Sequence, residues 1–258
     1  MILKRHHNEI LHHLYTYRFL HRIHIQTLLH HKQFSRVIVW LNELTKQGYI
    51  RRYYNAKTVT VPAIYSLGLK SRKYMKGNPD FKDINPLVLD RIWREYTLSS
   101  QFRKHCQFVA DFYLSLVSLT QKTKATLHFY TKTALYGMNY LILPNPDVYF
   151  SITEKNGRKM YYFLDIFDEL PARMALRKRI RQYAQYYADE YWQDHTNKPF
   201  PEIILICSDD RSKKYLYRFI QKILDDESEL HFYLSTWDII RIKGVSRETL
   251  QKVEPQNR

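Results

Sequence analysis

The 258-residue sequence predicts an α/β protein with two domains. Apolar residues recur at helical spacing through most of the N-terminal half, whereas short runs typical of strands follow from Ala125. Turn-forming residues at 77–80 interrupt the helical part and follow a strongly basic segment. We therefore expect one domain at residues 1–78, a second at 86–243 and a polar C-terminal tail at 244–258.

An amphipathic helix lies at the centre of the first domain. Its apolar positions, spaced three or four residues apart, are Phe34, Val37, Leu41 and Leu44. Ser35 is the expected N-cap, since its hydroxyl can accept from a free backbone N–H of the first turn. Gly48 follows the helix, where a left-handed residue commonly ends one.

Two strands are predicted after that glycine. The first is Ile50–Tyr54, the polar turn is 55–57, and the second strand runs from Val59 towards Leu67. A helix, a glycine and a hairpin in this order are typical of a winged helix-turn-helix, in which the helix enters the major groove and the hairpin flanks the backbone. This pattern predicts that the first domain binds double-stranded DNA.

The distribution of charge supports the same prediction. The net charge is +16, and residues 1–80 carry fourteen Lys/Arg against three Asp/Glu, which is a net charge of +11. A basic first third on a more neutral body is typical of a nucleic-acid-binding protein. The alternative is a cationic surface that serves only solubility.

Specific side chains are expected to contact DNA. Positions near the start of the helix would read bases, and Arg36 can donate two hydrogen bonds to guanine, whereas Val39 can only touch a thymine methyl. Arg51, Arg52 and Lys57 of the hairpin are expected at phosphates. The full set of expected DNA contacts is Gln33, Ser35, Arg36, Val39, Lys46, Arg51, Arg52 and Lys57. Alternatively, Ile38, Val39 and Trp40 form an apolar protein–protein surface.

The remaining elements follow from the same periodicity. Helices are expected at 8–19, 23–31, 67–76, 172–192 and 212–224, with one or two more over 86–119. Strands are expected at 126–130, 139–143, 146–152, 160–167, 202–207 and 231–235, with a hairpin turn at 154–157.

The histidines and cysteines indicate no metal site. Eight of the twelve histidines precede residue 32, in adjacent pairs with no cysteine nearby, so we expect them on a solvated or DNA-facing surface. Cys106 and Cys207 are too far apart in sequence for a Cys-x-x-Cys motif and are expected to be reduced, as in a cytoplasmic protein. No apolar run approaches the roughly 18 residues of a membrane span, and the N-terminus lacks a signal peptide.

The second domain carries two acids at strand ends. The predicted order of helix, three strands, helix and strand resembles the core of restriction-endonuclease-like folds, which hold a divalent metal with carboxylates. Their pattern is Pro-Asp followed by Asp/Glu-x-Lys. Pro146-Asp147 matches the first part, but Asp165-Ile166-Phe167 has phenylalanine in place of the lysine that activates water.

Two interpretations of these acids remain open. An active metal-dependent endonuclease would use Asp147 and Asp165 as Mg²⁺ ligands, with Lys178 and Gln182 as further catalytic residues. A basic group could reach in from the following helix, where Arg173, Arg177 and Lys178 are available. We favour the other interpretation, a non-catalytic fold without a cofactor, in which Asp168 and Glu169 cap that helix.

Short motifs along nearly the whole chain resemble the replication-relaxation family. They are Leu41-x-x-Leu44-x-x-x-Gly48-Tyr49-Ile50, Tyr65-x-Leu67, Pro146-Asp147-Val148, Tyr162-Phe163-Leu164-Asp165-Ile166 and Leu176-x-x-x-Ile180-x-x-Tyr183. The family often continues Val-Asp-Arg-Gly-Thr after the acid at position 165, and this chain departs from that pattern.

The resemblance implies a winged helix joined to a nuclease-like domain, in a DNA-binding protein that supports replication or relaxation of a plasmid or mobile element. The further candidate partners are a second copy of the chain, as a homodimer, and a replication or relaxase protein. The alternatives are the endonuclease above and a transcriptional regulator whose second domain dimerises or binds a ligand.

Overall fold

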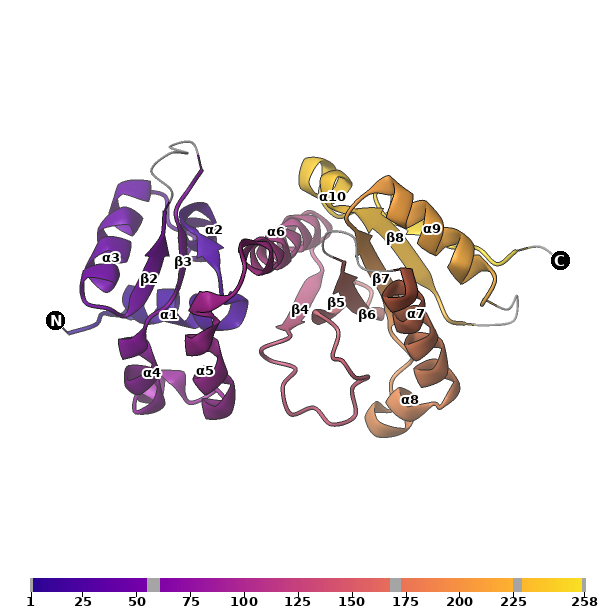
Figure 1. Ribbon diagram of the computed structural model, residues 1–258, viewed down its shortest axis with the longest axis horizontal. Coiled ribbons are helices and arrows are strands. Elements are labelled where there is room, and N and C mark those ends of the chain that lie inside the picture. The colour runs from indigo at the N-terminus through magenta and orange to yellow at the C-terminus, as the bar shows by residue number, and fades with distance from the viewer. Residues whose placement is uncertain (1, 55–60, 168–172, 225–228, 257–258) are drawn as a thin grey trace. The chain divides into compact units, whose positions relative to one another are not determined.

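The computed structural model describes residues 2–54, 61–167, 173–224 and 229–256. The chain divides into two compact units, Met1–Ala110 and Asp111–Arg258, both mixtures of helices and strands (Figure 1). The predicted α/β class is therefore confirmed. Among the described residues, the structure contains no helix with the length and hydropathy of a membrane span.

The first unit packs helices around a small antiparallel sheet. Its elements are α1 (Arg5–Tyr17), β1 (Leu20–His21), α2 (Arg22–Leu28), α3 (Phe34–Lys46), β2 (Ile50–Tyr53), β3 (Ile64–Leu67), α4 (Leu69–Lys76), the 3₁₀ turns η1 (Pro79–Phe81) and η2 (Trp93–Thr97), and α5 (Pro86–Ile92). The sheet has the order β1-β3-β2. The predicted apolar positions Ile10, Leu11 and Leu14 of α1 are fully buried.

Two glycines join α3 to the sheet. Gly48 has φ +79, which lets the chain turn out of α3 as predicted, and Tyr49 N–H donates back to the Leu44 carbonyl at 2.9 Å. Gly68 follows β3 and lies so close to this turn that a Cβ would sit 2.5 Å from the Gly48 carbonyl oxygen. Only glycine fits there, so the end of α3 and the end of the hairpin are locked together.

The division between the units falls later than the sequence indicated. We expected a boundary between residues 78 and 86, but α5 and η2 belong to the first unit. Asp90 of α5 binds both Arg72 and Lys76 of α4, and these bonds lower the pKa of Asp90 to about 2. Arg18 Nε likewise donates to Glu95 at 2.6 Å. Ion pairs and apolar contacts therefore continue the first unit past the turn at 77–80.

The second unit is built on a six-stranded mixed sheet. Its order is β4-β5-β6-β7-β8-β9, antiparallel among the first three strands and parallel from β6 to β8. The strands are β4 (Thr126–Thr131), β5 (Val148–Thr153), β6 (Lys159–Ile166), β7 (Glu202–Cys207), β8 (Phe232–Thr236) and β9 (Gln251–Lys252). The helices are α7 (Arg173–Ala188), α8 (Tyr191–Thr196), α9 (Asp210–Gln221) and α10 (Trp237–Lys243), and α6 (Ser100–Thr123) enters from the first unit.

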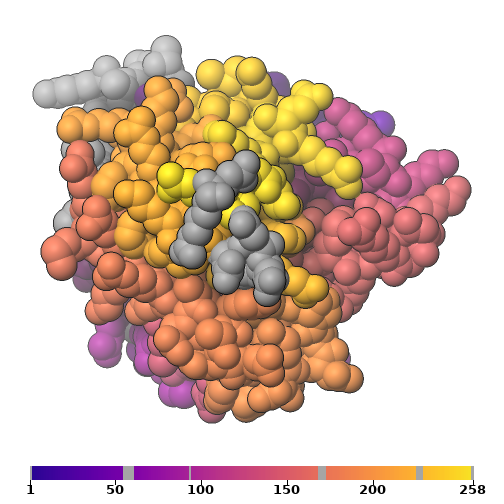
Figure 2. Space-filling model, turned by 90° about the vertical axis from the view of Figure 1, so that its right-hand side faces the viewer, coloured from indigo at the N-terminus to yellow at the C-terminus, as the bar shows by residue number. Residues whose placement is uncertain are grey.

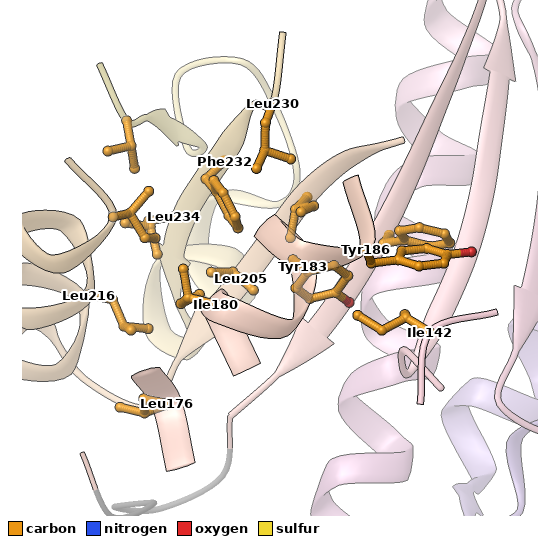
Figure 3. Packing of buried hydrophobic residues seen from close by; sticks show 14 of the residues in the cluster. Ile142, Leu176, Ile180, Tyr183, Tyr186, Leu205, Leu216, Leu230, Phe232 and Leu234 are labelled. Atoms are coloured by element: carbon orange, nitrogen blue, oxygen red, sulfur yellow. The ribbon is translucent and has the colours of Figure 1, made fainter. Parts of the chain in front are cut away.

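One face of this sheet holds the main core. Ile180 and Tyr183 of α7 lie next to Leu205 of the sheet (Figure 3). Leu176 of α7, Leu216 of α9 and Leu234 of β8 belong to the same buried cluster. Adjacent residues of a strand point to opposite faces, so Phe163 meets Tyr183 whereas Tyr162 stacks on Phe150 on the other side. This apolar contact fixes which side of α7 faces the sheet.

Two predictions for the second unit were wrong. Residues 139–143 form no strand; they belong to a long connection in which Leu141 and Ile142 are buried and Tyr186 donates to the Tyr140 carbonyl at 2.5 Å. The segment from residue 244 is also not simply a polar tail, because Val245 and Val253 are buried and β9 pairs with β8. These apolar residues enter the core from irregular segments. Alternation of apolar and polar residues occurs in such segments as well as in strands, so the sequence pattern alone cannot tell the two apart.

Candidate functional site

Helix α3 packs one face into the core of the first unit, so its opposite face points to solvent. Val37, Leu41 and Leu44 are fully buried against the first unit, as predicted. The opposite side is exposed, and Val39 retains 52% of its accessible surface. The predicted base-reading residues lie on this outward side, namely Gln33, Ser35, Arg36 and Val39, and Lys46 is exposed at the other end of the helix.

The start of α3 differs from the prediction in two ways. Phe34 was expected in the core but is 57% exposed, and the Arg22 guanidinium lies 5.6 Å from its ring centre. A helical side chain leans towards the N-terminus, so at the first helical position it extends beyond the helix. Ser35 was expected as N-cap, but Gln33 holds that position without a side-chain capping bond. Both changes leave more of the first turn accessible.

The alternative, in which Ile38, Val39 and Trp40 form a protein–protein surface, has little exposed apolar area. Trp40 is only partly exposed because His6 stacks on its indole at 4.1 Å and His31 meets it edge-on at 4.9 Å. Ile38 is also half-buried, which leaves Val39 as the exposed member of that trio.

The hairpin arginines occupy different environments. Arg51 is half-buried with its guanidinium 3.6 Å from the ring centre of Tyr96, whereas Arg52 is exposed and lies 5.0 Å from the ring of Tyr54. Lys57 lies outside the described residues. Arg52 is therefore the more accessible of the two, and Arg51 is held in place by an aromatic ring.

The histidines do not share one solvated surface, contrary to our expectation. His7 and His24 are buried with 2% exposure each. His7 Nδ1 accepts from the Lys4 backbone N–H at 3.2 Å, and its Nε2 lies 3.1 Å from Glu43 Oε2, so α1 is joined to α3. Burial lowers the pKa of His13 to about 4. Several of these rings are therefore packing groups between helices.

The two acids of the second unit lie on neighbouring strand ends, as their spacing predicted. Asp147 precedes β5, and its Oδ2 accepts from the Ile166 backbone N–H at 2.9 Å. Its Oδ1 lies 3.6 Å from Lys132 Nζ. Asp165 lies near the end of β6 and is 6% exposed. Asp147 thus joins two strands and remains the more accessible acid.

Arg179 of α7 occupies the position beside Asp165. Its Nε donates to Asp165 Oδ2 at 2.5 Å, its Nη2 donates to Oδ1 at 3.2 Å, and its Nη1 donates to the Pro144 carbonyl at 2.8 Å. Tyr183 Oη donates to Asp165 Oδ2 at 3.0 Å. Burial alone would disfavour a charged guanidinium, but the Asp165 carboxylate outweighs it and raises the pKa of Arg179. Burial also raises the pKa of Tyr183 well above its usual value.

The sequence had suggested other basic residues for this role. Arg173, Arg177 and Lys178 are all exposed, and Gln182 is half-buried. Arg179 was overlooked, although it lies three residues after Leu176 and four before Tyr183, on the face of α7 that packs on the sheet. That spacing was the available signal. Asp168 and Glu169 lie outside the described residues.

This centre does not fit a catalytic magnesium site. Both oxygens of Asp165 accept hydrogen bonds from Arg179 or Tyr183, so the cation that this carboxylate requires is already supplied by the protein. Phe167 occupies the place of the expected lysine, and its carbonyl accepts from the Trp237 indole at 3.1 Å. The arrangement joins α7 to the sheet.

Comparison with known proteins identifies the family. A family model described as replication-relaxation matches residues 11–203, which include parts of both units. The chain belongs to the replication-relaxation family. The resemblance inferred from short motifs is therefore confirmed, and membership suggests a role in replication or relaxation of a plasmid or mobile element. Neither curated proteins nor solved structures gave a match.

Proposed function

We propose that this replication-relaxation protein binds double-stranded DNA through its first unit, which acts as a winged helix. The observation that carries the proposal is the orientation of α3. Its apolar face is fully buried at Val37, Leu41 and Leu44, and its opposite face is exposed from Gln33 onward. A helix held in this way can place its first turns in a major groove while a neighbouring hairpin reaches the backbone.

The contacts on α3 support modest sequence specificity. Arg36 lies in the first turn of α3 and is exposed. Its guanidinium can donate two hydrogen bonds to O6 and N7 of guanine. The side chains of Ser35 and Gln33 can both donate and accept hydrogen bonds at base edges, and Val39 can contact a thymine methyl. Most of the affinity would come from the net charge of +11 in residues 1–80 acting on phosphates.

The second unit is proposed to be a nuclease-like domain that acts without turnover. The order of α6, β4, β5, β6, α7 and β7 corresponds to the helix–strand pattern predicted for that fold. The engagement of Asp165 by Arg179 supports a structural role for this acid. The protein would then act by holding DNA, or a replication or relaxase protein, at a site chosen by the first unit.

Selection of duplexes from a random pool by the full-length protein tests this function. The enriched duplex should be protected from cleavage at a short site, and Arg36→Ala should weaken the protection. Comparison of binding to replication-origin and promoter fragments of a mobile element that carries the gene separates a replication role from transcriptional regulation. Failure to enrich any duplex would refute the proposal.

A further inference from the structure

We propose that α7 and α9 of the second unit form a second binding face for the phosphate backbone of nucleic acid. The feature is a row of arginines on α7, Arg173, Arg177 and Arg181, which lies along α9. This face uses none of the residues assigned to the first unit, so the proposal goes beyond the DNA contacts of α3 and the hairpin.

Each arginine of the row lies over an aromatic ring of α9. The Arg173 and Arg177 guanidinium carbons lie 4.9 and 5.3 Å from the ring centre of Tyr215. Arg177 and Arg181 lie 5.1 and 5.6 Å from the ring centre of Phe219. A cation–π contact of this kind holds the guanidinium near the ring and leaves N–H groups available to bind an anion.

The row is exposed to solvent and carries three positive charges. Arg173, Arg177 and Arg181 are all exposed, and no ion pair involves them within the residues that the structure describes. Arg179 on the same helix differs because it faces the sheet and binds Asp165. Figure 2 shows that residues of this part of the chain, in orange and amber, make up much of the visible surface of the second unit.

The spacing of the row fits a regular polyanion. Residues four apart on an α-helix are separated by about 6 Å along the axis, so the row spans about 12 Å. A strand of B-form DNA carries a phosphate about every 3.4 Å of helix axis, so the row is long enough to reach several neighbouring phosphates. Exposed Lys178 on α7 and Arg218 on α9 add further positive charge beside the row. Arginine is suited to phosphate because its planar group donates two parallel hydrogen bonds.

The test compares two triple variants of the full-length protein. Arg173→Gln/Arg177→Gln/Arg181→Gln removes the row. The control, Lys155→Gln/Arg158→Gln/Lys159→Gln, removes the same charge from the exposed β5–β6 hairpin of the same unit. Binding to one fixed duplex is measured from low to high salt. Loss of three phosphate contacts should reduce the log–log salt slope by about 2 to 3, and the control should change it by less than about 1.

The outcomes separate this proposal from the proposed function. Equal slopes for the two triple variants would overturn the proposal, even if Arg36→Ala still weakens the preferred site. If the row variant alone loses affinity while Arg36→Ala and the hairpin arginine variants have no effect, the first-unit proposal fails and this one stands. If the row binds polyglutamate more tightly than the duplex at equal salt and equal ligand charge, it is a binding face for acidic protein, and the proposal is overturned.

Discussion

The guanidinium of Arg179 donates from Nε to Asp165 Oδ2 at 2.5 Å and from Nη2 to Oδ1 at 3.2 Å. This buried pair lies between α7 and the sheet, and Tyr183 completes it with a third hydrogen bond to Asp165. The carboxylate that the sequence motif suggested as a metal ligand thus attaches a helix to the sheet. The two predictions that follow, on stability and on DNA cleavage, both rest on this contact.

Arg179→Met is expected to destabilise the protein by about 3–5 kcal/mol, because it leaves the buried Asp165 carboxylate without a cation. Arg179→Met/Asp165→Leu should recover part of the loss, since it removes both charges. Denaturant unfolding measures both, and Arg181→Met on the exposed side of α7 is the control. Equal stability of Arg179→Met and the control would contradict the structural role of the pair.

The full-length protein is expected to leave supercoiled plasmid intact in the presence of Mg²⁺ or Mn²⁺. Asp165 is engaged by Arg179, and Phe167 stands where a lysine would activate water. Gel electrophoresis of the plasmid gives the readout. Nicking that disappears in Asp147→Ala would support the endonuclease alternative instead.

Arg36→Ala is expected to cost about 1–3 kcal/mol on the preferred duplex and to relax the preference at one base pair. Binding to a set of single-base variants of the selected site measures both effects. Lys82→Ala removes one exposed charge elsewhere in the first unit and should weaken all duplexes slightly and equally. If Arg36→Ala leaves the footprint unchanged while Val39→Asp abolishes self-association, α3 is a protein–protein surface.

Arg51→Ala/Arg52→Ala is expected to weaken specific and random duplexes by similar factors, because hairpin contacts to phosphate carry no sequence information. Competition binding with both kinds of duplex gives the two factors. A loss confined to the specific site would show that the hairpin reads bases.

Acid is expected to destabilise the first unit partly through His13. Burial lowers its pKa from 6.5 to about 4, so between these values the unfolded chain binds a proton that the folded protein does not. This contribution to stability is complete above pH 6.5 and is lost as the pH falls towards 4. His13→Gln should therefore reduce the proton uptake on unfolding near pH 5 by about one proton. The free energy of unfolding, measured with denaturant from pH 7 to 4.5, gives this proton uptake. The control is His128→Gln, at an exposed position. If both variants show the same pH dependence of stability, His13 is not the group responsible.

Local patterns predicted much of the secondary structure. Ile10, Leu11 and Leu14 gave the buried face of α1, and the run 202–207 gave the buried strand β7. Glu154–Gly157 gave the turn between β5 and β6, where Gly157 has φ +86. These features depend on residues a few positions apart, whose spacing is visible in the sequence.

Long-range contacts decided the rest. The helical spacing places Arg179, unlike Lys178, on the same face of α7 as Leu176. That this side chain reaches Asp165, fourteen residues earlier, depends on how α7 packs on the sheet. The exposure of Phe34 likewise depends on where α3 begins relative to the core. The family, the α/β class and the excess of positive charge in the first 80 residues follow from the amino-acid sequence alone. The fold is needed to tell which charges are paired inside the protein and which, such as Arg173, Arg177 and Arg181, face solvent, because burial and ion pairing join residues from separate elements.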